Sequence, residues 1–153
     1  MNTRLQTPAE LPAITLYQPW ATWIAEGLKT IETRPHGRFG SLVGQRIVIH
    51  AGKTFDAGAS SIAWQCRSGV AAQLAKIGRR SNDYPLGAIV CTAVVKEHRR
   101  VRGTDSAAAL CRCTYDCFGL FLEAVRRIDP PIPWRGERGI WTVPVSALPP
   151  ESL

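Results

Sequence analysis

Three charged side chains stand within six residues, at a point where a helical pattern gives way to an alternating one. Residues 27–34 have the pattern G-x-K-x-x-E-x-R, with Lys29, Glu32 and Arg34 as the charged members. Glycine adopts left-handed dihedrals at little steric cost, so Gly27 predicts the end of a helix. The three charges could hold one another by ion pairing and bind a polar ligand. A surface salt-bridge set that stabilises little is the alternative.

The residues around the motif predict a short helix followed by a strand. Apolar residues recur at helical spacing over residues 20–28. Residues 30–34 alternate, so a strand there would place Glu32 and Arg34 on one face. Trp20 stands at the start of the helix, where it could pack in the core or line the mouth of a cleft.

Farther along the chain, short apolar runs predict additional strands, and an alanine-rich segment predicts one or two helices. The near-continuous apolar run at residues 88–95 is typical of a buried strand. The prolines of residues 130–133 are expected to interrupt regular pairing. His50 stands at the end of another expected strand. It is either a core histidine with its hydrogen bonds satisfied or part of a site. The expected strands cover residues 13–17, 30–34, 45–50, 88–95, 120–128 and 140–145, and the helical segment covers residues 57–77.

The chain is basic, and most of its positive charge is arginine. Its 153 residues carry a formal net charge of +7, and 15 of the 19 basic residues are arginine. The planar guanidinium suits phosphate and base recognition, so the composition favours a nucleic-acid partner without requiring one. The basic clusters fit either a phosphate-binding surface or solvated loops and strand ends. The arginines expected on a nucleic-acid surface are Arg79, Arg80, Arg99, Arg100 and Arg102.

Other features of the sequence bear on compartment and metal binding. No apolar run approaches the roughly 20 residues of a membrane span, and no signal-peptide core is seen, so we expect a cytoplasmic protein without a membrane partner. The five cysteines are odd in number, which argues against a disulfide framework. Cys111, Cys113 and Cys117 form a C-x-C-x-x-x-C cluster, but zinc usually takes two close pairs of ligands. Reduced, partly buried thiols are favoured over zinc, and neither metal nor cofactor is expected.

Three stretches of the chain resemble a known family. Residues 14–34, ITLYQPWATWIAEGLKTIETR, are similar to the opening of the ASCH domain, the activating signal cointegrator homology family. Residues 83–87, DYPLG, resemble its middle, and residues 131–141, PIPWRGERGIW, resemble its closing pattern. The resemblance implies an α+β protein with a small PUA-like β-barrel and flanking α-helices. It implies a single ASCH domain at residues 13–147, followed by a C-terminal tail at residues 148–153, and the polar residues 1–12, with two prolines, predict a flexible N-terminal tail.

The resemblance also implies a site and a function. In the family the lysine, glutamate and arginine of the motif line a cleft between helix and barrel, and the preceding Gln-Pro-Trp signature lies close by. The family is associated with RNA or nucleotide binding. The leading hypothesis is therefore a module that binds RNA, another single-stranded nucleic acid or a nucleotide-like small molecule in this cleft. The expected ligand-binding residues are Gln18, Trp20, Lys29, Glu32, Arg34 and His50.

Two alternatives remain from the sequence. Some small bacterial members of the family are amidohydrolases that remove the acetyl group from acetylcytidine with a lysine, a threonine and a glutamate. Their nucleophilic threonine stands three residues after the motif lysine, where this chain has Glu32, which argues against that reaction. A hydrolase acting on a modified nucleoside or on RNA would use Lys29 and Glu32 as catalytic residues, with the carboxylate as a base on water. The other alternative is a protein-binding domain whose charge serves solubility.

Overall fold

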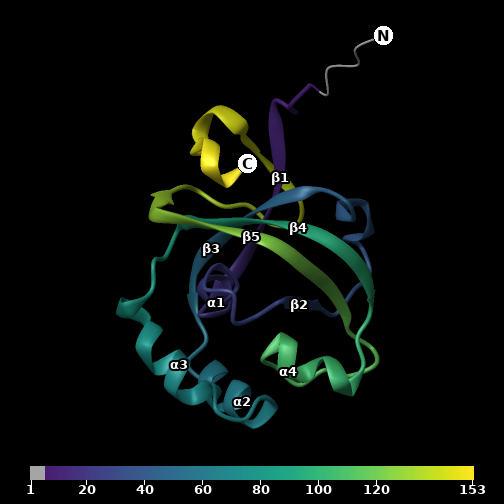
Figure 1. The fold of residues 1–153 in the computed structure, drawn as a ribbon, viewed down its shortest axis with the longest axis vertical. Coiled ribbons are helices and arrows are strands. Elements are labelled where there is room, and N and C mark those ends of the chain that lie inside the picture. Colours follow the sequence, from purple (N-terminus) through teal and green to yellow (C-terminus); the bar gives the residue numbers. More distant parts are fainter. Residues whose placement is uncertain (1–5) are drawn as a thin grey trace.

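A single six-stranded sheet organises the protein. The structure, a computed structural model, describes residues 6–153 and has the strand order β2-β5-β4-β3-β1-β6 (Figure 1). Neighbouring strands are antiparallel except β1 and β3, which are parallel. The strands are β1 (Glu10–Gln18), β2 (Ile31–Arg34), β3 (Arg46–Phe55), β4 (Ala88–Arg100), β5 (Phe118–Pro133) and β6 (Trp141–Pro144).

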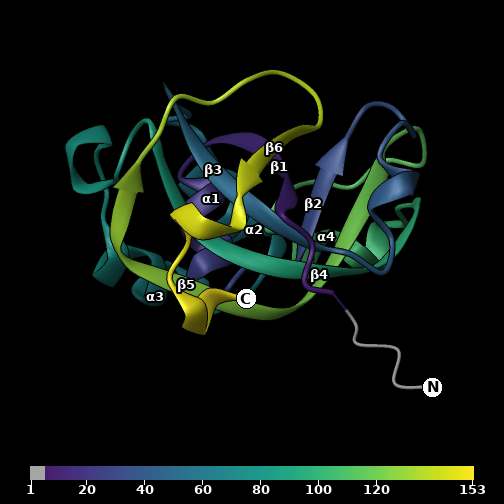
Figure 2. The same cartoon turned by 90° about the horizontal axis from the view of Figure 1, so that it is seen from above.

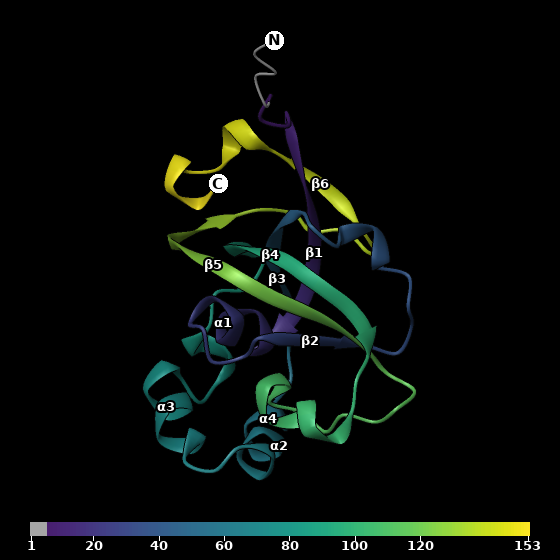
Figure 3. The same cartoon turned by 45° about the vertical axis from the view of Figure 1, so that its right-hand side comes forward.

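The helices complete an α+β fold. Helices α2, α3 and α4 gather at one end of the molecule, and the C-terminal segment lies at the opposite end (Figures 1 and 3). The expected helical segment at residues 57–77 forms two helices, which are separated at Gly69 with a φ of 77°. In the described part of the chain, no helix has the length and apolar character to cross a membrane. The helices are α1 (Trp20–Ala25), α2 (Ala59–Cys66), α3 (Val70–Ile77) and α4 (Ser106–Ala109).

The sheet curls toward a barrel without closing. Strand β2 pairs with β5 and strand β6 pairs with β1, so β2 and β6 are the edges of the sheet. A side chain bridges the opening between β1 and β2, because Arg34 Nη2 donates a hydrogen bond to the Thr15 carbonyl at 3.1 Å. We call this opening the seam. The connection at residues 134–140 arches away from the sheet before β6 (Figure 2). The predicted fold is thus confirmed, with a barrel that stays open at the seam.

Local sequence sets the turn from β1 through α1 to β2. Gln18 is fully buried, and its Nε2 donates to Thr22 Oγ1 at 2.7 Å and to the Pro85 carbonyl at 2.8 Å. Its Oε1 accepts a hydrogen bond from the Thr22 N–H at 3.0 Å, which holds the first turn of α1. Gly27 follows the helix with a φ of 75°, as its predicted role as a helix stop requires. The charged motif therefore begins at a defined turn.

Apolar side chains fix α1 against both the sheet and the helices. The largest cluster joins α1 to β1, β3, β4 and β5, with Ile24 and Ile49 fully buried. In another cluster Trp23 joins α1 to α2 and α3, and its Nε1 donates to Tyr84 Oη at 3.2 Å. A further cluster lies beneath β6 and the C-terminal segment. Because α1 packs against both the sheet and the helices α2 and α3, the motif that follows it has a fixed position.

Several boundaries differ from those expected, and strands β3 and β4 continue past residues 50 and 95, to Phe55 and Arg100. Strand β1 begins at Glu10, within the segment expected as a tail, because its first residues pair with β6. Strand β5 continues through Pro133, where it has β4 on one side only, so prolines without an N–H can face outward. The C-terminal segment packs on the sheet, and the carbonyl of buried Ser152 accepts a hydrogen bond from Thr92.

Candidate functional site

Lys29 is a buried cation that joins the start of β2 to the end of α4. Its side chain is 2% exposed, and its Nζ donates to the carbonyls of Ile31 at 2.7 Å and Ala109 at 2.6 Å. Nζ also lies 3.6 Å from Glu32 Oε2 and 5.0 Å from the centroid of the Trp20 ring. Two of the three ammonium protons are therefore donated to backbone carbonyls, and the positive charge of Nζ lies next to the Glu32 carboxylate.

Glu32 lies between two cations. Its side chain is 11% exposed, with Lys29 Nζ at 3.6 Å from one oxygen and Arg34 Nε at 3.5 Å from the other. Both distances exceed those of ordinary hydrogen bonds, so the carboxylate keeps the capacity to accept hydrogen bonds from a ligand. Arg34 Nε is itself buried and makes no hydrogen bond to any residue between 6 and 153. The structure thus brings the three charged residues of the motif together.

A cleft of about 430 Å³ opens at the seam over this carboxylate. Its aromatic lining comes from Tyr17, which is 58% exposed, Trp20, which is half-buried, and Phe39, which is buried. The Arg34 guanidinium lies 5.4 Å from the centroid of the Phe39 ring. We call this the motif cleft, and its volume falls within the roughly 300–1,000 Å³ of small-molecule sites. It is lined by Thr15, Leu16, Tyr17, Trp20, Glu32, Arg34, Phe39, Glu137, Arg138 and Gly139.

A pocket of about 170 Å³ lies behind the carboxylate, toward the cysteines. Thr33 faces this pocket, with its Oγ1 3.5 Å from Cys111 Sγ, as strand alternation predicts. Burial, and next the neighbouring Cys111 thiol, raise the pKa of Cys113 to about 11, so this thiol is protonated at neutral pH. All five cysteines are free, and within residues 6–153 no group of His, Cys, Asp and Glu side chains is arranged to hold a metal ion.

A larger cavity of about 850 Å³ adjoins the motif cleft. Both are lined by Thr15, Glu137 and Arg138, so the two spaces meet at these residues. We call the larger space the basic cavity, because Lys53 and Arg135 line it together with Arg138.

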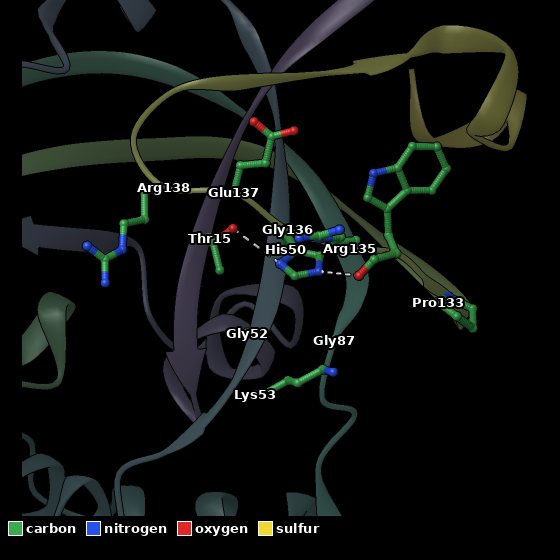
Figure 4. Close-up of a pocket in the computed structure, with 11 residues that line it drawn as sticks. Thr15, His50, Gly52, Lys53, Gly87, Pro133, Arg135, Gly136, Glu137 and Arg138 are labelled. Carbon is green, nitrogen blue, oxygen red and sulfur yellow. Dashed lines mark hydrogen bonds between the residues drawn. The ribbon is translucent and has the colours of Figure 1, made fainter.

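Gln18 and His50 lie outside the motif cleft. The amide of Gln18 is used by the hydrogen bonds that begin α1. His50 borders the basic cavity, where its Nε2 lies 2.8 Å from the Trp134 carbonyl and its Nδ1 lies 3.3 Å from Thr15 Oγ1 (Figure 4). A carbonyl can only accept, so Nε2 carries the proton and Thr15 donates to Nδ1. Trp141 Nε1 donates in turn to Thr15 Oγ1 at 3.2 Å. Burial lowers the pKa of His50, in agreement with this neutral form.

The five arginines expected on a nucleic-acid surface do not line the motif cleft. Residues 79–80 precede β4 and residues 99–102 lie at its far end, so most of the length of this strand separates the two groups. Arg99 donates to the Asp105 carboxylate at 2.9 and 3.2 Å, which ties it to its own loop. Arg100 Nη1 donates to the Tyr115 carbonyl at 3.1 Å. The structure therefore places these arginines in separate patches.

Sequence reasoning missed the charges of the connection at residues 134–140. Glu137 and Arg138 line both the motif cleft and the basic cavity, and Arg135 lines the latter. The available signal was the sequence Arg-Gly-Glu-Arg-Gly, in which three charged residues are combined with two glycines in a turn between two strands. Its position next to the motif depends on how β6 pairs with β1, which no local pattern predicts.

Comparison with known proteins identifies the family. A crystal structure of ASCH from Zymomonas mobilis is similar, with a TM-score of 0.57 and 13% identity over 89% of this chain and 89% of that chain. Crystal structures of two single-residue mutants of the Zymomonas mobilis protein, each 16% identical, cover 79% of this chain and 72% and 73% of theirs, with TM-scores of 0.47 and 0.45. None of the curated proteins matches the chain. The ASCH domain model matches residues 14–131, so the chain belongs to the ASCH domain family, which is associated with RNA-binding, PUA-like modules.

Proposed function

We propose that the protein binds single-stranded RNA or a nucleotide by placing one base in the motif cleft. The observation that carries this proposal is the carboxylate of Glu32, which two cations hold at the base of an aromatic-lined cavity. A carboxylate fixed in this way accepts hydrogen bonds from the ring N–H or exocyclic amine of a base. The family's association with RNA favours RNA over DNA.

The lining of the cleft suits the other parts of a nucleotide. Tyr17 is largely exposed and Trp20 is half-buried, so a base can stack on either ring. Stacking of this kind contributes about 1–3 kcal/mol per base. Arg138 also lines the cleft and is exposed, so its guanidinium can form a bidentate contact with a phosphate.

Hydrolysis centred on Lys29 and Glu32 has less support in this geometry. Lys29 donates to two carbonyls and is almost fully buried, so it is poorly placed to exchange a proton with a ligand. Thr33 faces the cysteines. Thr15 donates to a histidine, but Gly136 covers it so closely that an added Cβ would lie 2.7 Å from its hydroxyl oxygen. These contacts favour binding over turnover.

The test compares two tyrosine variants in binding to a short, fluorescently labelled single-stranded RNA. Tyr17→Ala removes an exposed ring from the motif cleft, and Tyr115→Ala removes a ring that is 84% exposed at another surface, near Arg100. We expect Tyr17→Ala to weaken binding by about 1–3 kcal/mol, or roughly 5–150-fold, and Tyr115→Ala to leave it within about twofold. Glu32→Gln should also weaken binding, because a carboxylate acceptor is replaced by an amide.

Other outcomes would contradict the proposal. If the wild-type protein binds neither RNA nor any of the common nucleoside monophosphates, the binding function is wrong. If Tyr115→Ala weakens binding and Tyr17→Ala does not, the ligand occupies the patch near Arg100. Equal affinity for DNA of the same sequence would remove the preference for RNA.

A further inference from the structure

We propose that the basic cavity is a second subsite, which binds the phosphate that follows the base held in the motif cleft. This inference rests on the proposed function and extends it. It makes the site at least two subsites long and gives the bound strand a path, from the motif cleft over Glu137 and Arg138 into the basic cavity.

The side chains around the basic cavity are suited to an anion. Lys53 of β3 and Arg135 and Arg138 of the connection before β6 are exposed, and Glu137 is the acidic residue among the lining. None of the three cations makes a salt bridge to any residue between 6 and 153, so their charge is available to a ligand. Arg99 differs, because its charge is already paired with Asp105. The formal charge of the lining favours a phosphodiester, which carries one negative charge.

The two subsites divide the chemistry of a nucleotide. Glu137 and Arg138 line both spaces; besides them, the motif cleft has three aromatic side chains with Glu32 and Arg34, whereas the basic cavity has Lys53, Arg135 and the half-buried Trp134. Both share Arg138, so a phosphate bound there lies next to a base bound in the cleft. Figure 4 shows Arg138, Lys53 and Pro133 on different sides of the basic cavity, with His50 between them.

The backbone on this side is held in place, and glycines contribute to the lining. His50 donates to the Trp134 carbonyl, and Gly136 packs so closely that an added Cβ would lie 2.5 Å from the imidazole ring. Gly87 also lines the cavity, and the Trp134 N–H donates to its carbonyl at 3.0 Å. The segment that carries Arg135 and Arg138 is therefore fixed at its base, which reduces the entropy cost of binding an anion.

The test measures how RNA affinity depends on salt. Lys53→Gln/Arg135→Gln removes two cations from the basic cavity, and Lys96→Gln/Arg126→Gln is a control that removes the same charge from exposed positions outside it. Each phosphate contact on a single strand contributes about 0.7 to the slope of log K against log salt concentration. If both cations contact phosphate, the slope should fall by about 1.4 and affinity at about 0.1 M salt should fall roughly 25-fold.

Each outcome is informative. The expected result is a reduced slope in the cavity variant, a smaller change in the control, and an unchanged slope in Tyr17→Ala despite its weaker binding. If Tyr17→Ala weakens binding while the cavity variant behaves like the control, the second subsite is wrong and the motif cleft stands. If wild type does not bind RNA, both proposals are wrong. All four substituted cations are exposed, so we expect both double variants to fold like wild type. Circular dichroism of each variant tests this expectation.

Discussion

Replacing Lys29 with methionine tests whether the motif lysine is a structural cation. Lys29→Met keeps the side-chain length but removes both hydrogen bonds to the Ile31 and Ala109 carbonyls, and it leaves Glu32 with a single cation. Each buried carbonyl left unpaired costs about 1–3 kcal/mol, and breaking a buried ion pair costs about 3–5 kcal/mol in all. We therefore expect the free energy of unfolding to fall by at least about 3 kcal/mol, a large part of the roughly 5–15 kcal/mol typical of a domain. Urea denaturation followed by tryptophan fluorescence measures this loss.

Two further variants make the test of Lys29 specific. Arg127→Met removes an exposed ion pair with Glu26, at 2.9 Å and with the arginine side chain 53% exposed, so it should cost less than about 1 kcal/mol. In Lys29→Met/Glu32→Gln the carboxylate that has lost one of its two cations is absent, so the loss should be smaller than the sum of the two single losses by about 1 kcal/mol or more. The reasoning is refuted if Lys29→Met unfolds within about 1 kcal/mol of wild type. A variant of that kind that also loses RNA binding would make Lys29 a ligand contact.

Two other predictions concern His50 and Gly136, which pack together beside the basic cavity. Burial lowers the pKa of His50 below its ordinary value of 6.5, so the unfolded chain protonates first and stability should fall as the pH drops below about 6.5. Thermal unfolding measured below about pH 6.5 should show a weaker pH dependence in His50→Gln than in wild type. An identical dependence would contradict the assignment of His50 as a neutral, buried imidazole. Gly136→Ala should cost about 1–3 kcal/mol in urea denaturation, because its Cβ meets His50 and Thr15, while Gly103→Ala, with open space around it, should change stability by less than about 0.5 kcal/mol.

The local elements of the fold could be predicted from the sequence because their signals are local. Helical spacing and Gly27 predicted α1 and its end, and alternation predicted which face of β2 carries Glu32. The parallel pairing of β1 with β3 could not be predicted, because it depends on contacts far apart in the chain. The length of β5 was also missed. The prolines of residues 130–133 predicted an interruption of pairing, but prolines are compatible with a strand that has a neighbour on one side only.

The candidate site also has features that the sequence predicted and features that it did not. The spacing of the motif predicted that Lys29, Glu32 and Arg34 would meet, but the partner that buries the lysine is the carbonyl of Ala109, 80 residues away. Gln18 was expected beside a ligand, whereas the Pro85 carbonyl, 67 residues away, receives its amide. The charges that border both cavities come from a connection whose place depends on the pairing of β6. Residue type and spacing show which groups are available, and long-range contacts determine which of them remain free for a ligand.

The seam has a consequence for how this fold accommodates different ligands. Between β1 and β2 the barrel is bridged by the bond from Arg34 to the Thr15 carbonyl, a contact made by a side chain. A wider ligand could therefore be admitted by a substitution at position 34, while every backbone hydrogen bond of the sheet stays intact. A closed barrel would have to lose ladder hydrogen bonds to make the same room. Divergence in ligand size can thus proceed at this position without a loss of pairing in the sheet.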